Sequence, residues 1–281
     1  MRYRYHFGEI KTPLLIDFLQ SNNIKHKVTE ASKFVPSLVI FDLWSDKDYT
    51  ERVLEELKEM NCRPISVDLE YTDLERNRAE LLWLWPKSQK IDIIKEDDSF
   101  DYLCEGTSIY GNACYKHKVQ KGALRISKEP SLKSKTVFWT ESTGFSVVFV
   151  AKQVYEAVTT SSLEGIDFWN VLKRNGSVSD SIFQMTSKHM IGRECVEPGH
   201  GEIIERCPIC GKEQFQTSSN YVMHLYFNKI QTQSDLYVTE RMFGAGFGHP
   251  NYIVSQRFYR FLKDNKLTGG LEFSPVFRAD S

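Results

Sequence analysis

The sequence predicts an α+β fold, in which an N-terminal ferredoxin-like split βαβ domain precedes a duplicated α+β module with a zinc-knuckle-like cysteine site. Strand-like and helix-like hydrophobic periodicities alternate from the N-terminus to residue 95. Beyond that point, two blocks of sequence recur in the same order. A Cys-Pro-Ile-Cys-Gly run then occupies residues 207–211. We place the first domain at residues 1–95 and the two copies of the module at residues 96–180 and 181–281.

The composition is that of an ordinary globular chain. Of the 281 residues, 36 are Lys or Arg and 37 are Asp or Glu, and 41% are hydrophobic. This apolar content is enough for a buried core, and the near-zero net charge argues against coating of nucleic acid by bulk electrostatics. The charged N-terminus shows no secretory signal, and no apolar run approaches the roughly 20 residues that span a bilayer. We therefore expect a cytoplasmic protein with a protein partner, without membrane association and without nucleic acid.

The first domain is predicted to run strand, helix, strand, strand, helix, strand, with one trailing strand. The strands are expected at residues 2–6, 27–29, 37–43 and 64–71, and the trailing strand at 81–85. Thr12 can cap a helix at residues 13–20, and Ser45 or Asp46 can cap a second helix at residues 49–60. This order matches a ferredoxin-like split βαβ unit, a fold that hosts many functions and therefore implies none.

The internal repeat consists of a short block and a longer one. The run TVFWTE at residues 136–141 matches DLYVTE at 235–240, and residues 149–171 match residues 253–276. The matched positions of the longer block include Val150/Val254, Tyr155/Tyr259, Leu163/Leu267, Gly165/Gly269, Phe168/Phe273 and Val171/Val276. Two blocks in the same order indicate a duplication.

Each copy predicts a strand, a short amphipathic helix and a returning strand. The apolar helix faces are i, i+3, i+4 sets, namely Val154, Ala157 and Val158 in the first copy and Phe258, Phe261 and Leu262 in the second. Ser255 can cap the second helix, whereas the matching Ala151 cannot. Gly165 and Gly269 suit left-handed caps at the helix C-termini. We interpret the repeated residues as structural.

The run at residues 207–211 predicts a zinc knuckle. Cys207 and Cys210 on a tight turn can both face one tetrahedral Zn²⁺, and Gly211 lets the backbone bend so that its amides point at the sulfurs. A thioredoxin-like redox site fits less well, because no apolar-periodic helix follows the motif.

Two further ligands are needed, and the sequence offers two sets. Cys104 and Cys114 precede the first short block as the CxxC pair precedes the second, so one pair from each copy would make a four-cysteine site. The rival set is local, with Cys195 and His200 joining the CxxC pair. We favour the four-cysteine set, although a C-x9-C spacing departs from the standard knuckle.

We expect this zinc to be structural. The sequence contains neither an HExxH helix nor an HxE–PCxxC deaminase signature, and its histidines are scattered without i, i+4 pairing. We therefore lean towards a protein that is not an enzyme. A metal-dependent hydrolase is the alternative, and it would need a zinc with an open coordination position.

A glycine-rich loop is the candidate binding surface. It lengthens the second copy relative to the first, and insertions on a rigid scaffold often carry recognition. Its candidate residues are Phe243, Gly244, Gly246, Phe247 and His249. The loop lacks the GK[ST] of a P-loop, and its third glycine falls one place too early for GxGxxG.

The CPICG run and the repeated Leu-x-Gly…Phe-x-x-Val endings resemble uncharacterised bacterial proteins that carry two CxxCG motifs in duplicated halves. The residues concerned are Cys207, Cys210 and Gly211, with Leu163, Gly165, Phe168 and Val171 and with Leu267, Gly269, Phe273, Ser274, Pro275 and Val276. The first CxxCG is not intact here, since Cys104 and Cys114 stand apart. Proteins of this kind are often associated with polymorphic-toxin loci, so the resemblance implies a role as an immunity protein.

Together these features lead us to expect a non-enzymatic, zinc-stabilised protein-binding protein, specifically an immunity-type inhibitor of a bacterial toxin. A zinc-ribbon nucleic-acid binder is the alternative from another class. It would use four basic residues of the second helix, Arg257, Arg260, Lys263 and Lys266, which otherwise form a solvated helix face. Salt-sensitive binding would distinguish the two functions.

Overall fold

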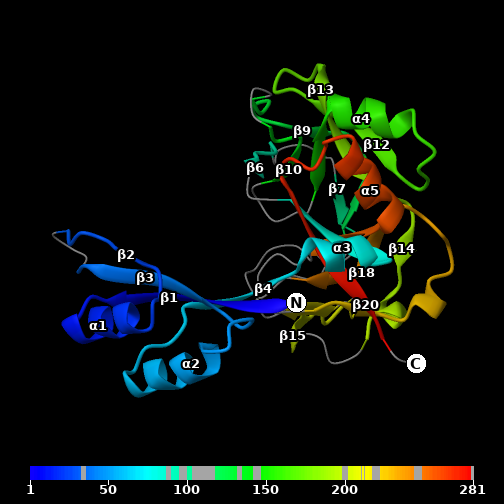
Figure 1. The fold of residues 1–281 in the computed structure, drawn as a ribbon. Coiled ribbons are helices and arrows are strands. Elements are labelled where there is room, and N and C mark those ends of the chain that lie inside the picture. The colour runs from blue at the N-terminus through cyan, green and yellow to red at the C-terminus, as the bar shows by residue number, and fades with distance from the viewer. Residues whose placement is uncertain are drawn as a thin grey trace. The chain divides into compact units, whose positions relative to one another are not determined.

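The computed structural model of the chain (Figure 1) divides into two compact units, one built on residues 1–73 and the other on residues 74–217 and 222–281. The structure describes residues 1–281 with the exception of 33–35, 87–89, 95–99, 103–117, 132–134, 142–146, 198–201, 210, 212, 217–221, 244–248 and 280–281. Helices and sheets occur together in the chain, which confirms the α+β class. Within the described residues, no helix is long and apolar enough to cross a membrane.

The first unit contains one antiparallel sheet and two helices. Its elements are β1 (Arg2–Ile10), α1 (Pro13–Ser21), β2 (His26–Val28), β3 (Leu38–Trp44), α2 (Thr50–Glu59) and β4 (Ser66–Glu70). The strands lie in the order β2-β3-β1-β4, and every neighbouring pair is antiparallel. Each helix therefore connects two strands that flank a third, so that the two connections interleave.

Both helices of the first unit pack into one core against the sheet. Leu15 and Leu19 of α1 and Val53 and Leu57 of α2 are buried there, because residues four apart lie on the same helix face. Thr12 caps α1 as predicted, since its hydroxyl accepts a hydrogen bond from the Leu15 N–H at 3.2 Å.

The predicted cap of α2 by Ser45 or Asp46 is wrong, because this helix begins without a side-chain cap hydrogen bond. Ser45 instead accepts a hydrogen bond from the Tyr3 N–H at 2.8 Å. The Thr50 hydroxyl donates to the Trp44 carbonyl at 2.6 Å. The hydroxyls at this corner therefore tie the end of β3 to β1 and to the helix that follows.

The second unit is built from two series of elements that have the same order, after a short helix α3 (Asp73–Arg78). The first series is β5 (Leu81–Pro86), β6 (Lys90–Ile91), β7 (Phe100–Tyr102), β8 (Lys118–Gln120), β9 (Leu124–Arg125), β10 (Phe138–Glu141), β11 (Val148–Ala151), α4 (Lys152–Thr159) and β12 (Asp167–Leu172). The second series is β13 (Val178–Thr186), β14 (Met190–Ile191), β15 (Glu202–Arg206), β16 (Glu213–Gln216), β17 (His224–Leu225), β18 (Leu236–Phe243), β19 (His249–Ser255), α5 (Gln256–Asp264) and β20 (Leu271–Arg278). Two 3-10 turns, η2 (Arg193–Cys195) and η3 (Phe227–Lys229), belong to the second series.

Except for β7 and β8, which pair only with each other, the described strands of the second unit form two large sheets. Their orders are β6-β10-β11-β13-β12-β9 and β15-β16-β18-β19-β5-β20-β17, with β14 beside β18. The trailing strand that we predicted for the first domain is β5, and it lies in the centre of the larger sheet between β19 and β20. Strand β13 was not predicted, because its buried positions include the polar residues Ser179 and Gln184, which obscure the alternation of apolar and polar side chains.

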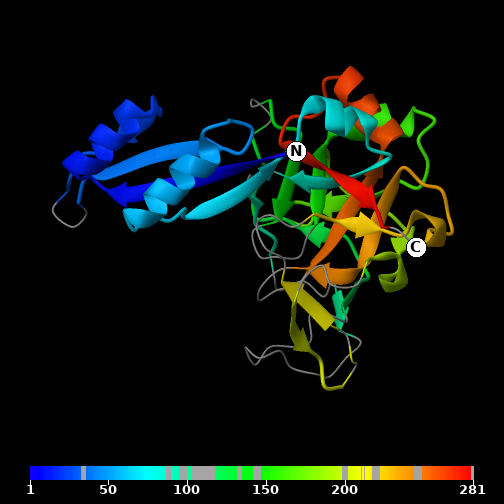
Figure 2. The same ribbon diagram turned by 60° about the horizontal axis from the view of Figure 1, so that its bottom comes forward.

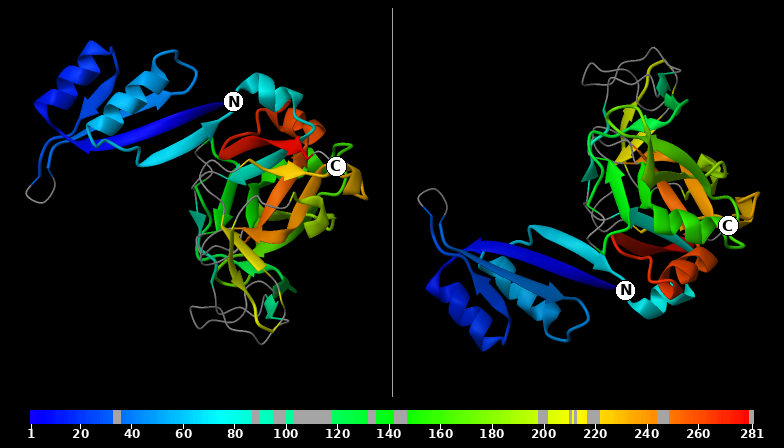
Figure 3. Two further views of the ribbon diagram at one scale, coloured as in Figure 1. Left: turned by 90° about the horizontal axis from the view of Figure 1, so that it is seen from below. Right: turned by 90° about the horizontal axis from the view of Figure 1, so that it is seen from above.

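The two helices of the repeat lie next to each other (Figures 1 and 3). α4 buries Val154 and Val158, and α5 buries Phe258 and Leu262, as their apolar faces predicted. The Ser255 hydroxyl caps α5 by accepting the Phe258 N–H at 3.0 Å. Ala151 gives α4 no side-chain cap, which confirms the expected difference. Buried residues of both series share one core, which includes Leu82, Phe138, Val150, Val254 and Phe258.

The prediction that Gly165 and Gly269 cap helices is wrong. In α5, the left-handed position is taken by Lys266, at φ 57°. The glycines lie where the two series approach each other. A Cβ atom on Gly165 would overlap the Ser234 hydroxyl, and a Cβ atom on Gly269 would overlap the backbone carbonyl of Lys135.

Each series carries one antiparallel hairpin, β7–β8 and β15–β16. Both hairpins project from the same end of the second unit (Figures 2 and 3). In sequence, Cys104 and Cys114 fall between β7 and β8, and Cys207 and Cys210 fall between β15 and β16.

Candidate functional site

A groove of about 730 Å³ opens beside the start of β18, and we take it as the candidate site. Its walls come from both series of the second unit. The charged residues that line it are Glu80 and Glu164 from the first part of the unit and Asp235, Arg257 and Arg278 from the second series.

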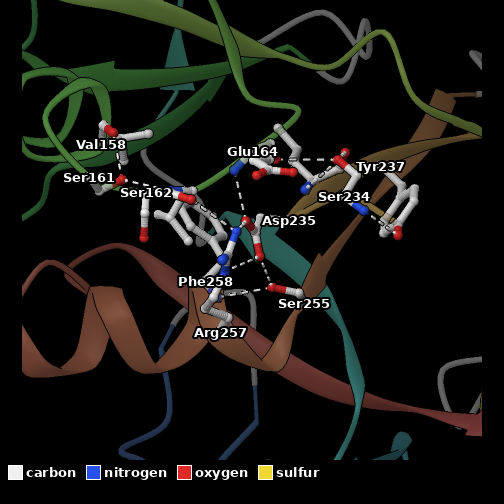
Figure 4. Close-up of polar contacts among 12 residues, drawn as sticks. Val158, Ser161, Ser162, Glu164, Ser234, Asp235, Tyr237, Ser255, Arg257 and Phe258 are labelled. Carbon is white, nitrogen blue, oxygen red and sulfur yellow. Dashed lines mark hydrogen bonds and ion pairs between the residues drawn. The ribbon is translucent and has the colours of Figure 1, made fainter. Parts of the chain in front are cut away.

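Asp235 lies at the centre of a polar network in the groove wall (Figure 4). β18 and β19 are antiparallel, so the residue before β18 faces the end of β19 and the start of α5. The Ser255 hydroxyl donates to Oδ1 of Asp235 at 2.5 Å, and Nε of Arg257 donates to the same oxygen at 3.1 Å. Oδ2 accepts a hydrogen bond from Nη2 of Arg257 and, at 2.8 Å, one from the backbone N–H of Glu164.

The Asp235 carboxylate is fully occupied by these contacts. The residue is only 3% exposed. Burial by itself would raise the pKa of this carboxyl, but the hydrogen bonds from Arg257, Ser255 and Glu164 outweigh it, and the pKa lies below its ordinary value. The same pairing raises the pKa of the Arg257 guanidinium. Both groups therefore keep their charges at neutral pH and hold each other in place.

The network also binds the two series together. The Glu164 carbonyl accepts the Asp235 N–H at 2.9 Å and the Ser234 hydroxyl at 3.4 Å. Nη2 of Arg257 donates to the Ser162 carbonyl at 3.0 Å. We call this contact, between residues 162–165 and residues 234–236 with Arg257, the Asp235 joint.

A second ion pair lines the groove. Nε and Nη2 of Arg278 donate to the two carboxylate oxygens of Glu80, at 3.0 and 2.6 Å. The Arg278 guanidinium also lies 4.7 Å from the centroid of the Phe227 ring. Both charged side chains are about 60% exposed, and exposed ion pairs of this kind contribute little to stability. A binding partner can therefore reach these charges at little cost in stability.

Of the four cysteines predicted to bind zinc, only Cys207 lies within the described residues. It is buried just after β15, and the Gly211 N–H donates to its carbonyl at 2.9 Å. Gly211 has φ +67°, so this tight turn uses the conformation that glycine adopts without strain. Cys104, Cys114 and Cys210 lie outside the described residues.

The rival ligand Cys195 is buried in η2. Its thiol donates to the Lys229 carbonyl at 3.5 Å, and burial, with the nearby Glu194 carboxylate, raises its pKa. His200 lies outside the described residues. In the described part of the chain, no group of three or more His, Cys, Asp and Glu side chains is placed to hold a metal ion.

The glycine-rich loop falls largely outside the described residues, which exclude Gly244, Gly246 and Phe247. Phe243 ends β18, where its side chain is buried with the ring centroid 6.3 Å from that of Phe215. His249 begins β19 and pairs with Phe243 across the strands. The Phe243 ring is therefore part of the packing and does not present a binding surface.

The basic residues of α5 mostly contact their own chain. Arg257 belongs to the Asp235 joint. Nη2 of Arg260 lies 3.4 Å from the Asn77 carbonyl, and Nζ of Lys263 lies 3.4 Å from Oδ1 of the same residue. Lys266 follows the helix. Three of the four cations considered for nucleic acid thus have partners within the chain.

Sequence reasoning missed the groove. It singled out Arg257 only as a cation of a helix face, and it did not consider Glu80, Glu164 or Arg278. The one available signal was the first position of the short block, where the sequence match sets Asp235 against Thr136. An acid that appears in only one of two repeats points to a role outside the shared fold.

Comparison with known protein families, curated proteins and solved structures finds no match for the chain.

Proposed function

We propose that the chain is a non-enzymatic protein-binding protein and that the groove beside Asp235 is its docking surface. The observation that carries the proposal is that Asp235 and Arg257, the charged residues at the centre of the groove, are already hydrogen-bonded to each other and to neighbouring groups of the chain. Asp235 accepts four hydrogen bonds and has a lowered pKa, whereas general acid–base catalysis needs a group whose pKa lies near the working pH. A preformed wall with exposed arginines and an aromatic ring instead suits a protein interface, where such residues are enriched among hot spots.

The partner that we propose is a bacterial toxin, which the chain would inhibit as an immunity protein. This part rests on the resemblance of the CPICG run and the repeat endings to proteins of toxin loci. An immunity protein acts by occluding a surface, so it needs a rigid docking face and no chemistry of its own. The charges fixed by the Asp235 joint support such a face.

Binding of the product of the adjacent gene tests the proposal. The two proteins are purified, their affinity is measured by calorimetry, and growth of cells that express the toxin is recorded with and without this chain. We expect a stable complex and protected growth. Failure to bind and to protect would remove the immunity function.

Charge-reversing variants locate the surface. Arg278→Glu places two acids together in the groove, and we expect it to weaken binding at least tenfold. Lys173→Glu is the matched control, because Lys173 forms the ion pair at the corresponding end of β12, with Asp180 at 2.8 Å. Equal losses from both variants would exclude the groove as the docking surface.

We further propose that a structural zinc ion stabilises the module through Cys104, Cys114, Cys207 and Cys210. Two observations support this proposal: the cysteine pairs fall in the connections of corresponding hairpins, and both hairpins project from one end of the unit (Figure 2). The turn at Cys207 also fits a knuckle, since its backbone closes on the Gly211 amide. Zinc would cross-link the two hairpins through thiolates and stabilise the fold.

Metal content of the purified protein tests the ligand set. Cys104→Ser, Cys195→Ser and Cys207→Ser variants are compared with the unaltered chain by elemental analysis. Loss of one zinc with Cys104→Ser and Cys207→Ser supports the four-cysteine site. Loss with Cys195→Ser in place of Cys104→Ser selects the local set that includes His200, and a metal-free unaltered protein removes the zinc proposal.

For the first unit, we propose a ferredoxin-like split βαβ fold. Its connectivity β1-α1-β2-β3-α2-β4 and its antiparallel strand order β2-β3-β1-β4 support this proposal. The fold itself does not imply an activity, so our functional proposal concerns the second unit.

A further inference from the structure

The strand pairings of the two series correspond, apart from the parallel pair β16–β18, which the described residues of the first series do not match. β6 pairs in parallel with β10 as β14 does with β18, and β9 pairs in parallel with β12 as β17 does with β20. β10–β11 and β18–β19 are antiparallel. Even the isolated bridges correspond, since Ile93 pairs with Ile126 in the first series and Val196 with Leu225 in the second.

All of these pairs join strands of the same series. The first strand of each series is the exception, because it pairs with strands of the other series. β5 opens the first series but pairs with β19 and β20 of the second. β13 opens the second series but pairs with β11 and β12 of the first. Both are antiparallel to both of their neighbours.

The registers of the two exchanged strands also agree. Leu82 of β5 lies opposite Val254, and Phe183 of β13 lies opposite Val150. Val150 and Val254 are matched positions of the sequence repeat. The two strands therefore occupy equivalent slots, which chance pairing of unrelated strands would not produce.

We infer that residues 74–281 are two equivalent repeats that have exchanged their first strands, so that each repeat presents a strand-binding slot whose partner is the first strand of the other. In this respect the module is a domain-swapped dimer joined into one chain. The slot between the second long strand and the last strand of a repeat takes an antiparallel strand with large buried side chains, such as Leu82 and Leu84 of β5.

A contact between equivalent residues supports the proposed symmetry. Tyr252 is hydrogen-bonded to the backbone of Val148, and its burial raises its pKa. Because Val150 matches Val254, Val148 and Tyr252 are themselves equivalent positions. A residue that contacts its own equivalent lies beside the axis that relates the two copies.

The exchange also builds the groove. Glu80 and Leu81 enter its lining because β5 lies in the sheet of the second repeat. If β5 lay in the sheet of its own repeat, Glu80 would not lie beside Arg278, and their ion pair would not form in the groove. The docking surface proposed above therefore depends on both repeats at once, although the exchange itself does not rest on that function.

Cleavage of the folded full chain between the repeats tests the exchange. A protease site is inserted between Asn175 and Gly176, in the exposed turn that joins β12 to β13. After cleavage, β5 stays with the N-terminal piece and β13 with the C-terminal piece. We expect the two pieces to elute as one species in native buffer and to separate only at denaturant concentrations that unfold the module, because each lacks a central strand without the other.

Cross-strand disulfides decide the topology directly. Trp83→Cys with Ser274→Cys joins positions that pair between β5 and β20, and Asn170→Cys with Phe183→Cys joins positions that pair between β12 and β13. After oxidation and cleavage, we expect each of these variants to run as one band on a non-reducing denaturing gel. The cleaved unaltered chain controls for the native cysteines. Thr140→Cys with Val148→Cys is the matched control within one repeat, and it should leave two bands.

If the control pair forms its disulfide but both cross-repeat variants still run as two bands on the non-reducing gel, the proposed exchange is wrong. Because cysteine substitutions can impair folding, hydrogen exchange of the cleaved chain without substitutions gives a second measurement. We expect β5 to be protected as strongly as β19. Pieces that separate in native buffer and each keep a slowly exchanging core would also overturn the proposal, whereas pieces that lose protection on separation would support it.

Discussion

The two repeats meet at two equivalent places, and different contacts hold the chain together at each. At the Asp235 joint, Gly165 approaches Ser234, and an ionised carboxylate with its four donors holds the contact. At the equivalent place, which we call the glycine joint, residues 135–138 meet residues 269–270. There the Val137 N–H donates to the Gly269 carbonyl at 2.9 Å, and a backbone carbonyl fills the space that a side chain would need.

The difference follows from three substitutions between the copies. Asp235, Ser255 and Arg257 of one joint correspond to Val137, Ala151 and Gln153 of the other, since the Ala151 N–H donates to the Val137 carbonyl as the Ser255 N–H donates to the Asp235 carbonyl. A glycine with positive φ keeps each close approach possible, Gly165 at one joint and Gly270 at the other, so the fold itself needs only the backbone contact. Asp235, Ser255 and Arg257 form a charged latch that is present at one joint only. This latch lies in the wall of the groove. The asymmetry between the joints therefore separates the contacts that the fold requires from those that are specific to the groove.

The largest effect is expected from filling the glycine joint. A Cβ atom at Gly269 would overlap the carbonyl of Lys135, which is backbone and cannot rotate away. We expect Gly269→Ala to lower the free energy of unfolding by about 3 kcal/mol, at the upper end of overpacking costs. Urea unfolding followed by circular dichroism measures this change.

Gly165→Ala tests the close approach at the Asp235 joint, where the overlapping group is a side chain. Its Cβ atom would meet the Ser234 side chain, and φ is +73°, where a non-glycine residue costs about 1–2 kcal/mol. We expect Ser234→Ala to recover part of this loss in the double variant, because it removes the overlapping hydroxyl. No single side-chain change can rescue Gly269→Ala in this way, so full rescue at both joints would contradict the distinction between them.

Removal of the latch is expected to have the next largest effect. Asp235→Asn replaces an acceptor by an amide whose NH₂ faces N–H donors, and it breaks the pair with Arg257. We expect a loss of about 2 kcal/mol in the free energy of unfolding, the scale of a hydrogen bond to a charged group that is lost from a buried site. The matched control is Gln153→Ala, at the exposed equivalent of Arg257, which should change stability by less than about 0.5 kcal/mol.

The latch also predicts a specific dependence on acid. The pKa of Asp235 is lowered in the folded chain, so its contribution is complete above the ordinary carboxyl pKa of about 3.9 and is lost as pH falls through the folded value. The stability difference between the unaltered chain and Asp235→Asn should therefore be constant from about pH 5 to pH 8 and shrink below about pH 4. Urea titrations at several pH values measure this difference. If it stayed constant throughout, Asp235 would not be the titrating group.

Local signals in the sequence predicted the local parts of the fold. Thr12 and Ser255 were recognised as caps because capping depends only on neighbouring residues. The apolar faces of α4 and α5 followed from helical periodicity for the same reason. Ser45 failed as a cap, because a hydrogen bond from Tyr3 across the sheet competed for its hydroxyl. That competition has no local signature.

The candidate site could not be predicted because it depends on pairing between distant segments. Glu80 and Arg278 meet only because β5 crosses into the sheet of the other repeat. Sequence analysis placed β5 in the first domain, where it follows the other strands along the chain. Asp235 was visible as a difference between repeats, but its partner Glu164 lies in the other copy, and a repeat alignment compares the copies without showing that they touch.

The smallest expected effect comes from installing in the first repeat a cap that only the second has. Ala151 has the extended backbone of an N-cap, at φ −70° and ψ 155°, nearly that of Ser255 at φ −69° and ψ 159°. A serine hydroxyl there can accept the Val154 N–H, as Ser255 accepts the N–H of Phe258. We expect Ala151→Ser to raise the free energy of unfolding by about 0.5–1 kcal/mol.

Ser255→Ala should lower the free energy of unfolding by more, since that hydroxyl also donates to Asp235. Denaturant titration of both variants, and of Ser255→Ala in the Asp235→Asn background, separates the two roles. In that background only the cap remains to be lost, so the cost of Ser255→Ala should fall to the size of the gain from Ala151→Ser. An unchanged cost would mean that the latch and the cap are independent, and that the two joints differ by less than their hydrogen bonds indicate.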